Sequence, residues 1–363
     1  MTERGPDYVA FGLDLFQRLA GASPDENVVI SPVSAGLALG MLANGATGQT
    51  LAQIERTLAT GLGLDALNEG NAALSRALHT DDVELAIANS LWARGPFLPA
   101  FVERVERLYG AEAGPLVSAK PINDWVSRNT AGRIKEMVQD PISPLIILFL
   151  LNAVYFKGRW QDEFDPERTR PRTFHTPSGP MERPMMSRAG YYGWLAASGF
   201  RAVRLPYRGD RFAMYVLLPD EGEDLARLRE RLTAEAWAGW MDGVRGKEVQ
   251  VVMPRYRIEA MSPLNDPLQA MGMRDAFVSG RAALDGMLPA DFVTRAAPYV
   301  AEVLQKVFVE VNEEGTEAAA ATVVAAAVRS LMHRREMFVV DRPFLLAIRD
   351  DTTGALLFIG QVN

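Results

Sequence analysis

Apolar residues recur every three or four positions in six stretches of the chain, which is the spacing of an amphipathic helix. Asp7 supplies a capping side chain for the first stretch. The second stretch carries stronger boundary signals, because Ser31 is a good N-cap residue, Pro32 suits a first helical turn and Gly45 favours a stop. The predicted helices cover residues 9–21, 32–45, 51–60, 101–109, 121–132 and 264–277.

Other stretches are continuously apolar or alternate, which indicates strands. The longest apolar run, residues 145–156, is too short to cross a bilayer and contains Asn152, so it is predicted to be a fully buried strand. Residues 338–363 are predicted to form a hairpin of two buried strands that turns at a Thr-Gly pair. The remaining predicted strands lie at residues 27–30, 83–93 and 299–312, and in strand pairs at 201–221, which turns at 208–210, and 249–260.

Composition is that of an ordinary folded protein, with 48% hydrophobic and 23% charged residues among 363. We expect one domain, residues 1–363. The net charge of -7 argues against a nucleic-acid-binding or heparin-binding surface. The absence of cysteine excludes disulfides, thiolate metal sites and cysteine nucleophiles.

The apolar strand at 299–312 is followed by a stretch suited to more than one conformation. Glu313 and Glu314 interrupt the apolar pattern, and Gly315 tolerates the backbone angles that a reversible hinge needs. Residues 316–328 are then almost all small or β-branched, with Glu317 as the only charge. Four consecutive alanines favour a helix by propensity. In an extended form, the residues that would share a core-facing side with Thr316 are Ala318, Ala320, Thr322, Val324 and Ala326.

The string EEGTEAAAAT resembles the hinge of the serpin family, and similar strings recur in the family's order from Asn27 to Val362. The resemblance implies an α+β serpin fold with three β-sheets, about eight to nine helices and an exposed reactive loop within residues 313–335. Because only five of the 38 basic residues are lysine, we expect a bacterial member. By resemblance the hinge comprises Glu313, Glu314, Gly315, Thr316, Glu317, Ala318, Ala319, Ala320, Ala321 and Thr322.

The resemblance implies a suicide-substrate inhibitor of serine proteases, whose cleaved loop inserts between the strands at 145–156 and 299–312. Its register places cleavage between Arg329 and Ser330, which suits a trypsin-like enzyme with a carboxylate in its specificity pocket. Alternatives that suit elastase-like or chymotrypsin-like enzymes are cleavages after Ala327, Val328, Leu331 or Met332.

A second group of residues resembles the region where the serpin strands separate: Ser31, Ser34, Asn152, Trp160 and Gln305. The family usually has a histidine where Gln305 stands. Glutamine offers a donor and an acceptor without titrating, so the opening step should lack the pH dependence of a histidine. The predicted helix at 121–132 resembles the serpin helix that crosses the main sheet and must yield during insertion.

The sequence contains no nucleophile elbow, phosphate loop or zinc-binding helix motif, so we expect no enzymatic activity, no metal and no cofactor. The expected partner is a serine protease, with no nucleic acid, membrane or heparin. A monomer is expected, although an opened sheet could accept another molecule's loop and form polymers.

Two further questions stay open from the sequence. A non-inhibitory serpin acting as a binding or folding-assistance protein is the alternative function, although the small hinge residues favour inhibition. The first ten residues lack the apolar segment of a secretory signal, which predicts a cytoplasmic protein if Met1 is the native start. The family resemblance instead implies an extracellular one.

Overall fold

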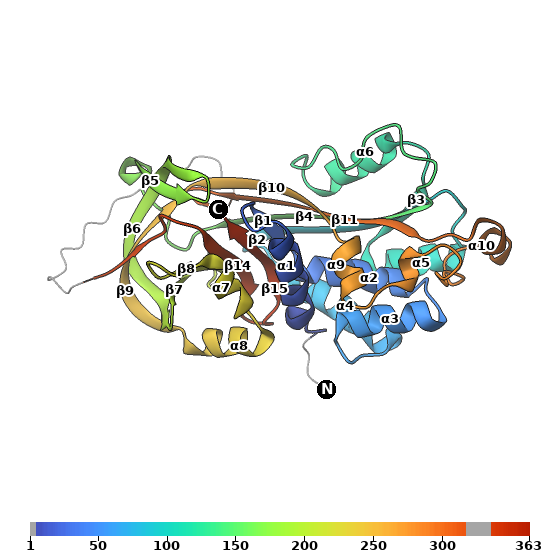
Figure 1. Ribbon diagram of the computed structural model, residues 1–363, viewed down its shortest axis with the longest axis horizontal. Helices are drawn as coiled ribbons and strands as arrows, with labels where there is room; N and C mark the ends of the chain where they lie inside the picture. Colours follow the sequence, from blue (N-terminus) through green and yellow to red (C-terminus); the bar gives the residue numbers. More distant parts are fainter. Residues whose placement is uncertain (1–4, 317–334) are drawn as a thin grey trace.

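The computed structural model describes residues 5–316 and 335–363. Within them, ten α-helices and 15 strands form a mixed α+β fold, and the strands are hydrogen-bonded into two sheets. The six-stranded sheet runs across the molecule with α6 on one side and most of the other helices on the opposite side (Figure 1). The α-helices are α1 (Val9–Ala22), α2 (Pro32–Ala43), α3 (Gly48–Leu58), α4 (Leu64–Leu78), α5 (Pro99–Tyr109), α6 (Ala119–Asn129), α7 (Leu225–Glu230), α8 (Ala234–Gly243), α9 (Asn265–Ala270) and α10 (Ala290–Ala296).

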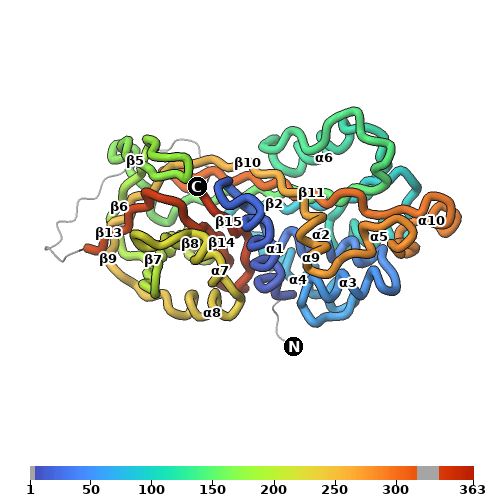
Figure 2. The backbone as a smooth tube through the Cα atoms, viewed as in Figure 1, coloured from blue at the N-terminus to red at the C-terminus, as the bar shows by residue number. Residues whose placement is uncertain are grey.

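The six-stranded sheet has the order β10-β11-β12-β4-β2-β3. Its members are β10 (Tyr256–Pro263), β11 (Val300–Val311), β12 (Gly315–Thr316), β4 (Leu148–Arg159), β2 (Val83–Ala93) and β3 (Glu112–Pro115). Figure 1 labels β11 and β4 side by side in the middle of this sheet, and Figure 2 traces the long stretch of chain that separates them. They run parallel to each other.

The nine-stranded sheet has the order β1-β15-β14-β8-β7-β6-β9-β13, and β5 pairs with β6 beside this path. Its members are β1 (Val28–Ile30), β5 (Arg170–Thr176), β6 (Gly179–Ala197), β7 (Phe200–Pro206), β8 (Phe212–Pro219), β9 (Arg245–Pro254), β13 (Glu336–Val339), β14 (Phe344–Asp350) and β15 (Leu356–Val362). The interior place and near-continuous burial of β14 and β15 confirm the predicted C-terminal hairpin.

Alternation along β4 gives the six-stranded sheet two different faces. Phe149 and Leu151 pack in a separate apolar cluster with Trp125 of α6. Leu150 and Val154, on the other side of the strand, belong to the main core that contains α2. Because a strand exposes successive side chains on opposite faces, an inserted strand would also have to present small or apolar groups on both.

The α+β class is confirmed. The described residues form two hydrogen-bonded sheets where three were expected, and ten α-helices where about eight to nine were expected. The 19 residues of β6 explain the sheet count, because this strand pairs with β5 at one end, with β7 at the other and with β9 between them. One long strand therefore joins two expected sheets into one. None of the helices in the described ranges is long and apolar enough to span a membrane.

Two predicted strands need correction. The strand predicted at 145–156 begins only at Leu148, because Leu145 lies in a turn, is 76% exposed and donates a hydrogen bond from its amide to the Ser143 hydroxyl oxygen. The strand pair predicted at 249–260 is not a pair, because β9 and β10 belong to different sheets. The chain crosses between the sheets at Arg255.

Candidate functional site

Strands β4 and β11 pair in parallel along most of their length, and we call the line between them the seam. The pairing stops before the C-terminal ends of both strands. Registered pairs run from Leu148 opposite Val300 to Tyr155 opposite Phe308. Beyond them the two strands no longer pair with each other, and β12 lies between them. The described beginning of the hinge segment therefore already occupies the top of this seam.

The register of the seam matches that of the short inserted strand. From Glu302 opposite Phe149 to Phe308 opposite Tyr155, each β11 residue carries a number 153 higher than its β4 partner. The two partners of Thr316, Val311 and Gly158, also differ by 153. One register therefore continues from the β4–β11 pairs into the contacts that both strands make with β12.

A tight turn connects β11 to β12. The side-chain oxygen of Asn312 accepts hydrogen bonds from the amides of Glu314 at 3.1 Å and Gly315 at 3.2 Å, and the Asn312 amide donates to the Gly315 carbonyl at 2.8 Å. A Cβ on Gly315 would collide with the backbone of Gly158 on β4. Close approach to β4 thus requires glycine here, whereas the sequence suggested only a need for conformational freedom.

The turn is also anchored from outside. Glu313 is buried, and its carboxylate accepts a hydrogen bond from the Thr169 hydroxyl at 2.6 Å and lies 3.5 Å from the Arg255 guanidinium. The Glu313 carbonyl accepts from the Phe164 amide at 2.7 Å. The Glu314 carbonyl accepts from the amide that follows β4. These contacts fix the direction in which the chain enters the sheet.

Thr316 is fully buried, on the side that the alternating pattern predicts. Its hydroxyl lies 2.6 Å from the hydroxyl of Tyr207, whose ring stacks on the indole of Trp160 with 4.7 Å between centroids. Complete burial raises the pKa of Tyr207 well above its usual value and outweighs the hydrogen bond with Thr316, which acts in the opposite direction. The phenol is therefore protonated at neutral pH and can donate to Thr316. The Trp160 indole donates to the Asn312 carbonyl at 2.9 Å.

A buried polar cluster crosses the seam further down. The Gln305 side chain accepts from the Ser31 amide at 2.8 Å, and donates to the Ser31 carbonyl at 3.1 Å and to the Asn152 side-chain oxygen at 2.6 Å. Gln305 and Asn152 are also registered partners on β11 and β4. Both side chains are fully buried, so their bond is a direct polar link between the strands.

Asn152 extends the cluster to two more elements. Its amide donates to the Ser34 hydroxyl on α2 and to the Asn89 side-chain oxygen on β2, the latter at 2.6 Å. Asn89 was missed in the sequence, where its one signal was an amide in an apolar strand. Four of the five residues predicted for the sheet-opening region thus lie together with Asn89.

The fifth, Trp160, does not join them. It follows Asn152 by eight residues along the chain, which corresponds to about 26 Å of extended backbone. The structure therefore divides the predicted sheet-opening region into a hinge group around Thr316 and a polar cluster around Gln305. The predicted residues Glu317, Ala318, Ala319, Ala320, Ala321, Thr322, Arg329 and Ser330 lie outside the described residues.

Within residues 5–316 and 335–363, no group of three or more His, Asp or Glu side chains is placed to hold a metal ion. His79 and His175 are both exposed. The described residues instead provide two parallel strands that pair directly along most of their length and are separated by the short strand β12 at one end. A formed turn connects β11 to β12.

Comparison with protein families gives a match over residues 7–363 to the family described as serpin (serine protease inhibitor). An uncharacterized serpin-like protein of Thermococcus kodakarensis is 35% identical, over 97% of this chain and 84% of the relative. The human leukocyte elastase inhibitor is 34% identical over 97% of each chain.

Solved structures give the same result. The native state of the thermophilic serpin tengpin is similar with a TM-score of 0.89 and 27% identity, over 100% of this chain and 96% of the other. Human thyroxine-binding globulin in complex with its hormone is similar with a TM-score of 0.88 and 26% identity, over 98% of this chain and 96% of the other.

Proposed function

Because this chain belongs to the serpin family, we propose that it is an irreversible suicide-substrate inhibitor of serine proteases. The protease serine attacks the carbonyl of Arg329, the bond to Ser330 breaks, and the amine of Ser330 leaves with a proton. The protease then carries an ester to Arg329. Insertion of the segment after Thr316 into the seam pulls this ester away before water can cleave it.

The observation that carries this proposal is the shared register of β4, β11 and β12. Continued past Thr316 at the same offset, the segment would place Thr322 opposite both Gln305 and Asn152. A threonine would therefore arrive at the one position where insertion separates two hydrogen-bonded amides. Its hydroxyl can both donate and accept, so it can replace the bond that they lose.

The other side chains on that path support insertion as well. The alternating pattern sends Ala318 and Ala320 to the core face and Glu317 to the face that carries α6. Small residues need little space between strands that are already close. The turn at Asn312 and Gly315 is already formed, so extension of β12 needs no new nucleus.

The hydrogen bonds that insertion would add can supply the free energy needed to move and distort the protease. Separation of β4 from β11 removes one ladder of hydrogen bonds, while an inserted strand makes two. Each ladder bond contributes roughly 0.5–1.5 kcal/mol, so a net gain of one ladder is on the order of 10 kcal/mol. The ester, 13 residues beyond Thr316, would travel about 40 Å. Distortion that removes even one oxyanion donor from the protease slows deacylation about 100-fold or more.

The side chain before the cleaved bond sets the target. Arg329 fits a trypsin-like enzyme, and the neighbouring apolar residues leave elastase-like and chymotrypsin-like enzymes as alternatives. The name of the leukocyte elastase inhibitor favours keeping elastase-like enzymes in the test.

A second function has one observation in its favour, since the similar thyroxine-binding globulin was solved with a bound hormone. Incubation of the protein with trypsin-like, chymotrypsin-like and elastase-like enzymes separates the two. Inhibition requires an SDS-resistant adduct with at least one enzyme, and the mass of the released C-terminal peptide identifies the cleaved bond. Cleavage without an adduct in every case would leave the binding or folding-assistance role.

A further inference from the structure

In the described part of the chain, β10 is the outermost strand at one side of the six-stranded sheet and pairs only with β11. Its other edge borders a groove of about 810 Å³. The facing wall of the groove comes from the C-terminal turns of α1, the turn before β1, and α9. Figure 1 shows α1 and α9 on the side of the sheet opposite α6. The groove thus combines the edge of a strand with the surfaces of two helices.

The ladder between β10 and β11 shows which backbone groups point into the groove. The Leu264 amide donates to the Val303 carbonyl at 2.8 Å, and this pair continues the register in which Pro263 lies opposite Leu304. Bonded pairs alternate along an antiparallel ladder, so the even-numbered residues of β10 bond to β11 and the odd-numbered ones point away. Pro263 fits this assignment, because proline has no N–H to lose at an outward position.

The N–H and C=O groups of Arg257, Glu259 and Met261 therefore point away from β11, and within residues 5–316 and 335–363 no hydrogen bond reaches them. Charged side chains often protect such an edge. Here Glu259 is instead paired with Lys306 of β11 at 2.9 Å, and the Arg257 guanidinium lies 4.7 Å from the ring centre of Phe308, also of β11. Both side chains lean back over the sheet, so the edge is open to a partner.

Apolar and acidic side chains line the facing wall. Leu19 and Ala22 of α1 and Pro267 of α9 contribute apolar surface. Glu26 and Asp266 line the groove as well, both are exposed, and neither forms an ion pair with another described residue. A strand that fills the groove should therefore direct apolar side chains and lysine or arginine toward this wall.

We propose that the free edge of β10 binds an extended basic segment of a partner protein, which joins the six-stranded sheet as an additional strand. The main chain of the partner would bond to the outward groups of β10, and its basic side chains would pair with Glu26 and Asp266. The cation of Arg18, which also lines the groove, is already balanced by Asp14 at 2.8 Å. The groove is separate from the seam, so this interaction does not depend on the proposed inhibition.

The probe is a blocked peptide of the sequence Lys-Thr-Val-Thr-Val-Thr-Lys, which is short enough to pair along the eight residues of β10. Its lysines and valines would face the wall and its threonines the open side. Two further versions carry N-methyl groups either on both valines or on all threonines. Successive amides of a strand point to opposite edges, so only one of these two sets can bond to β10. Isothermal titration calorimetry with the full chain measures binding.

Met261→Pro is the matching change in the protein, because it removes an outward N–H that the fold does not use. Met261→Ala is its control, since it removes the same side chain and keeps the N–H. Equal melting temperatures establish that both variants fold. The double variant Glu26→Lys/Asp266→Lys changes only exposed side chains and tests the charge of the groove.

We expect Met261→Pro to raise the dissociation constant of the probe about 10-fold or more, and Met261→Ala less than about threefold. One N-methylated peptide should bind like the unmodified probe and the other should lose binding. The charge-reversed variant should prefer a peptide with glutamate in place of each lysine. If Met261→Pro melts early, the methylated peptides decide alone, because they leave the protein unchanged.

Four results would overturn the edge-binding site or its basic partner. Equal loss of binding by both methylated peptides would exclude a ladder with β10. Binding that Met261→Pro leaves unchanged would place the peptide elsewhere, for example in the seam. An unchanged preference in the charge-reversed variant would exclude a basic partner. No binding of the unmodified probe at about 1 mM would exclude the site itself.

Discussion

The side-chain amide of Gln305 donates to the side-chain oxygen of Asn152 at 2.6 Å, and the two residues are registered partners on the strands that flank the seam. Their bond spans the line along which the sheet would open. It contains no group that titrates near neutral pH, so the cost of breaking it does not change with pH in that range.

Replacement of Gln305 by histidine should introduce pH dependence. A buried histidine beside the Ser31 amide is held neutral, so its folded pKa falls below the unfolded value of about 6.5. Stability is then present above about pH 6.5 and declines as pH falls, by up to about 1.4 kcal/mol per pH unit. Denaturant unfolding between pH 5 and 8 measures this. A flat profile for Gln305→His would show that the site is open to water.

Thr322 is predicted to stabilise the inserted state through its hydroxyl. Thr322→Val keeps the shape but leaves the amides of Gln305 and Asn152 unsatisfied, at a cost of about 1–3 kcal/mol. Guanidinium unfolding of the loop-cleaved protein should show this loss. Thr322→Ser, which keeps the hydroxyl, should show much less. Equal stability of the valine and serine variants would contradict the inserted register.

Thr316→Arg should convert the inhibitor into a substrate. Thr316 already lies fully buried in the seam against Tyr207, so a charge there costs about 3 kcal/mol, expels β12 and removes the formed start from which insertion would extend. Deacylation then wins, and gels should show cleaved protein with little adduct. Glu317→Arg is the matched control, because the alternation places that residue on the outer face. Trapping with unchanged stoichiometry in Thr316→Arg would refute the core-facing position.

Cleavage near Arg329 should raise the melting temperature by at least about 10 °C, since a net gain on the order of 10 kcal/mol shifts the transition by that much or more. Nicking of an ordinary loop leaves stability equal or lower. The measurement compares melting curves before and after limited proteolysis, with both fragments shown to stay associated. A cleaved form that melts at or below the intact protein would exclude insertion.

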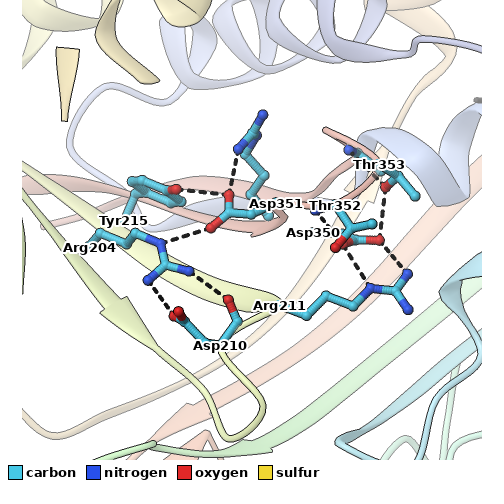
Figure 3. Close-up of polar contacts among 10 residues, drawn as sticks. Arg204, Asp210, Arg211, Tyr215, Asp350, Asp351, Thr352 and Thr353 are labelled. Carbon is cyan, nitrogen blue, oxygen red and sulfur yellow. Dashed lines mark hydrogen bonds and ion pairs between the residues drawn. The ribbon is translucent and has the colours of Figure 1, made fainter. Parts of the chain in front are cut away.

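The buried ion pair between Asp350 and Arg211 should account for most of the folding stability that is lost in acid. Figure 3 shows Asp350 accepting two hydrogen bonds from Arg211, at 2.9 and 2.6 Å. Burial alone would raise the pKa of Asp350, but hydrogen bonds from Arg211, Thr353 and Thr352 outweigh it and lower the pKa below its usual value. The stabilisation is therefore present above the unfolded pKa of about 3.9 and is lost as pH falls through the folded one.

Asp350→Asn should cost about 3 kcal/mol at pH 7, because it leaves the Arg211 charge without its partner, and should flatten the decline below pH 4. Asp210→Asn is the control, since Asp210 is 64% exposed in its pair with Arg204 and should change stability by less than about 0.5 kcal/mol. Urea unfolding across pH 3 to 7 measures both. A similar loss in the two variants would argue against a special role for the buried pair.

Periodicity predicted the elements well where burial is one-sided or continuous. The burial of β14 and β15 followed from their apolar runs, and the core position of Thr316 followed from alternation. Strand partners were harder to predict, because pairing depends on contacts between distant segments. Nothing local in the long β6 shows that it connects three other strands, and nothing at Arg255 shows that the chain changes sheets.

The residues of the candidate site also divide into those that could be predicted from the sequence and those that could not. The resemblance to the serpin family indicated Ser31, Ser34, Asn152 and Gln305, and the structure brings these four together. Tyr207 and Asn89 could not be predicted, because a tyrosine in a hairpin turn and an amide in a strand become informative only through their neighbours. The constant offset between β4 and β11 is likewise a property of the assembled sheet.

Under the proposed insertion, that offset also limits how the segment after Thr316 can change during evolution. Substitution among small residues leaves every other side chain on its own face. Insertion or deletion of one residue before Thr322 would move each following side chain to the opposite face, and a change of two residues would carry the threonine past the amides of Gln305 and Asn152. Descendants of this protein that keep the offset are therefore free to vary the composition of this segment but must inherit its length.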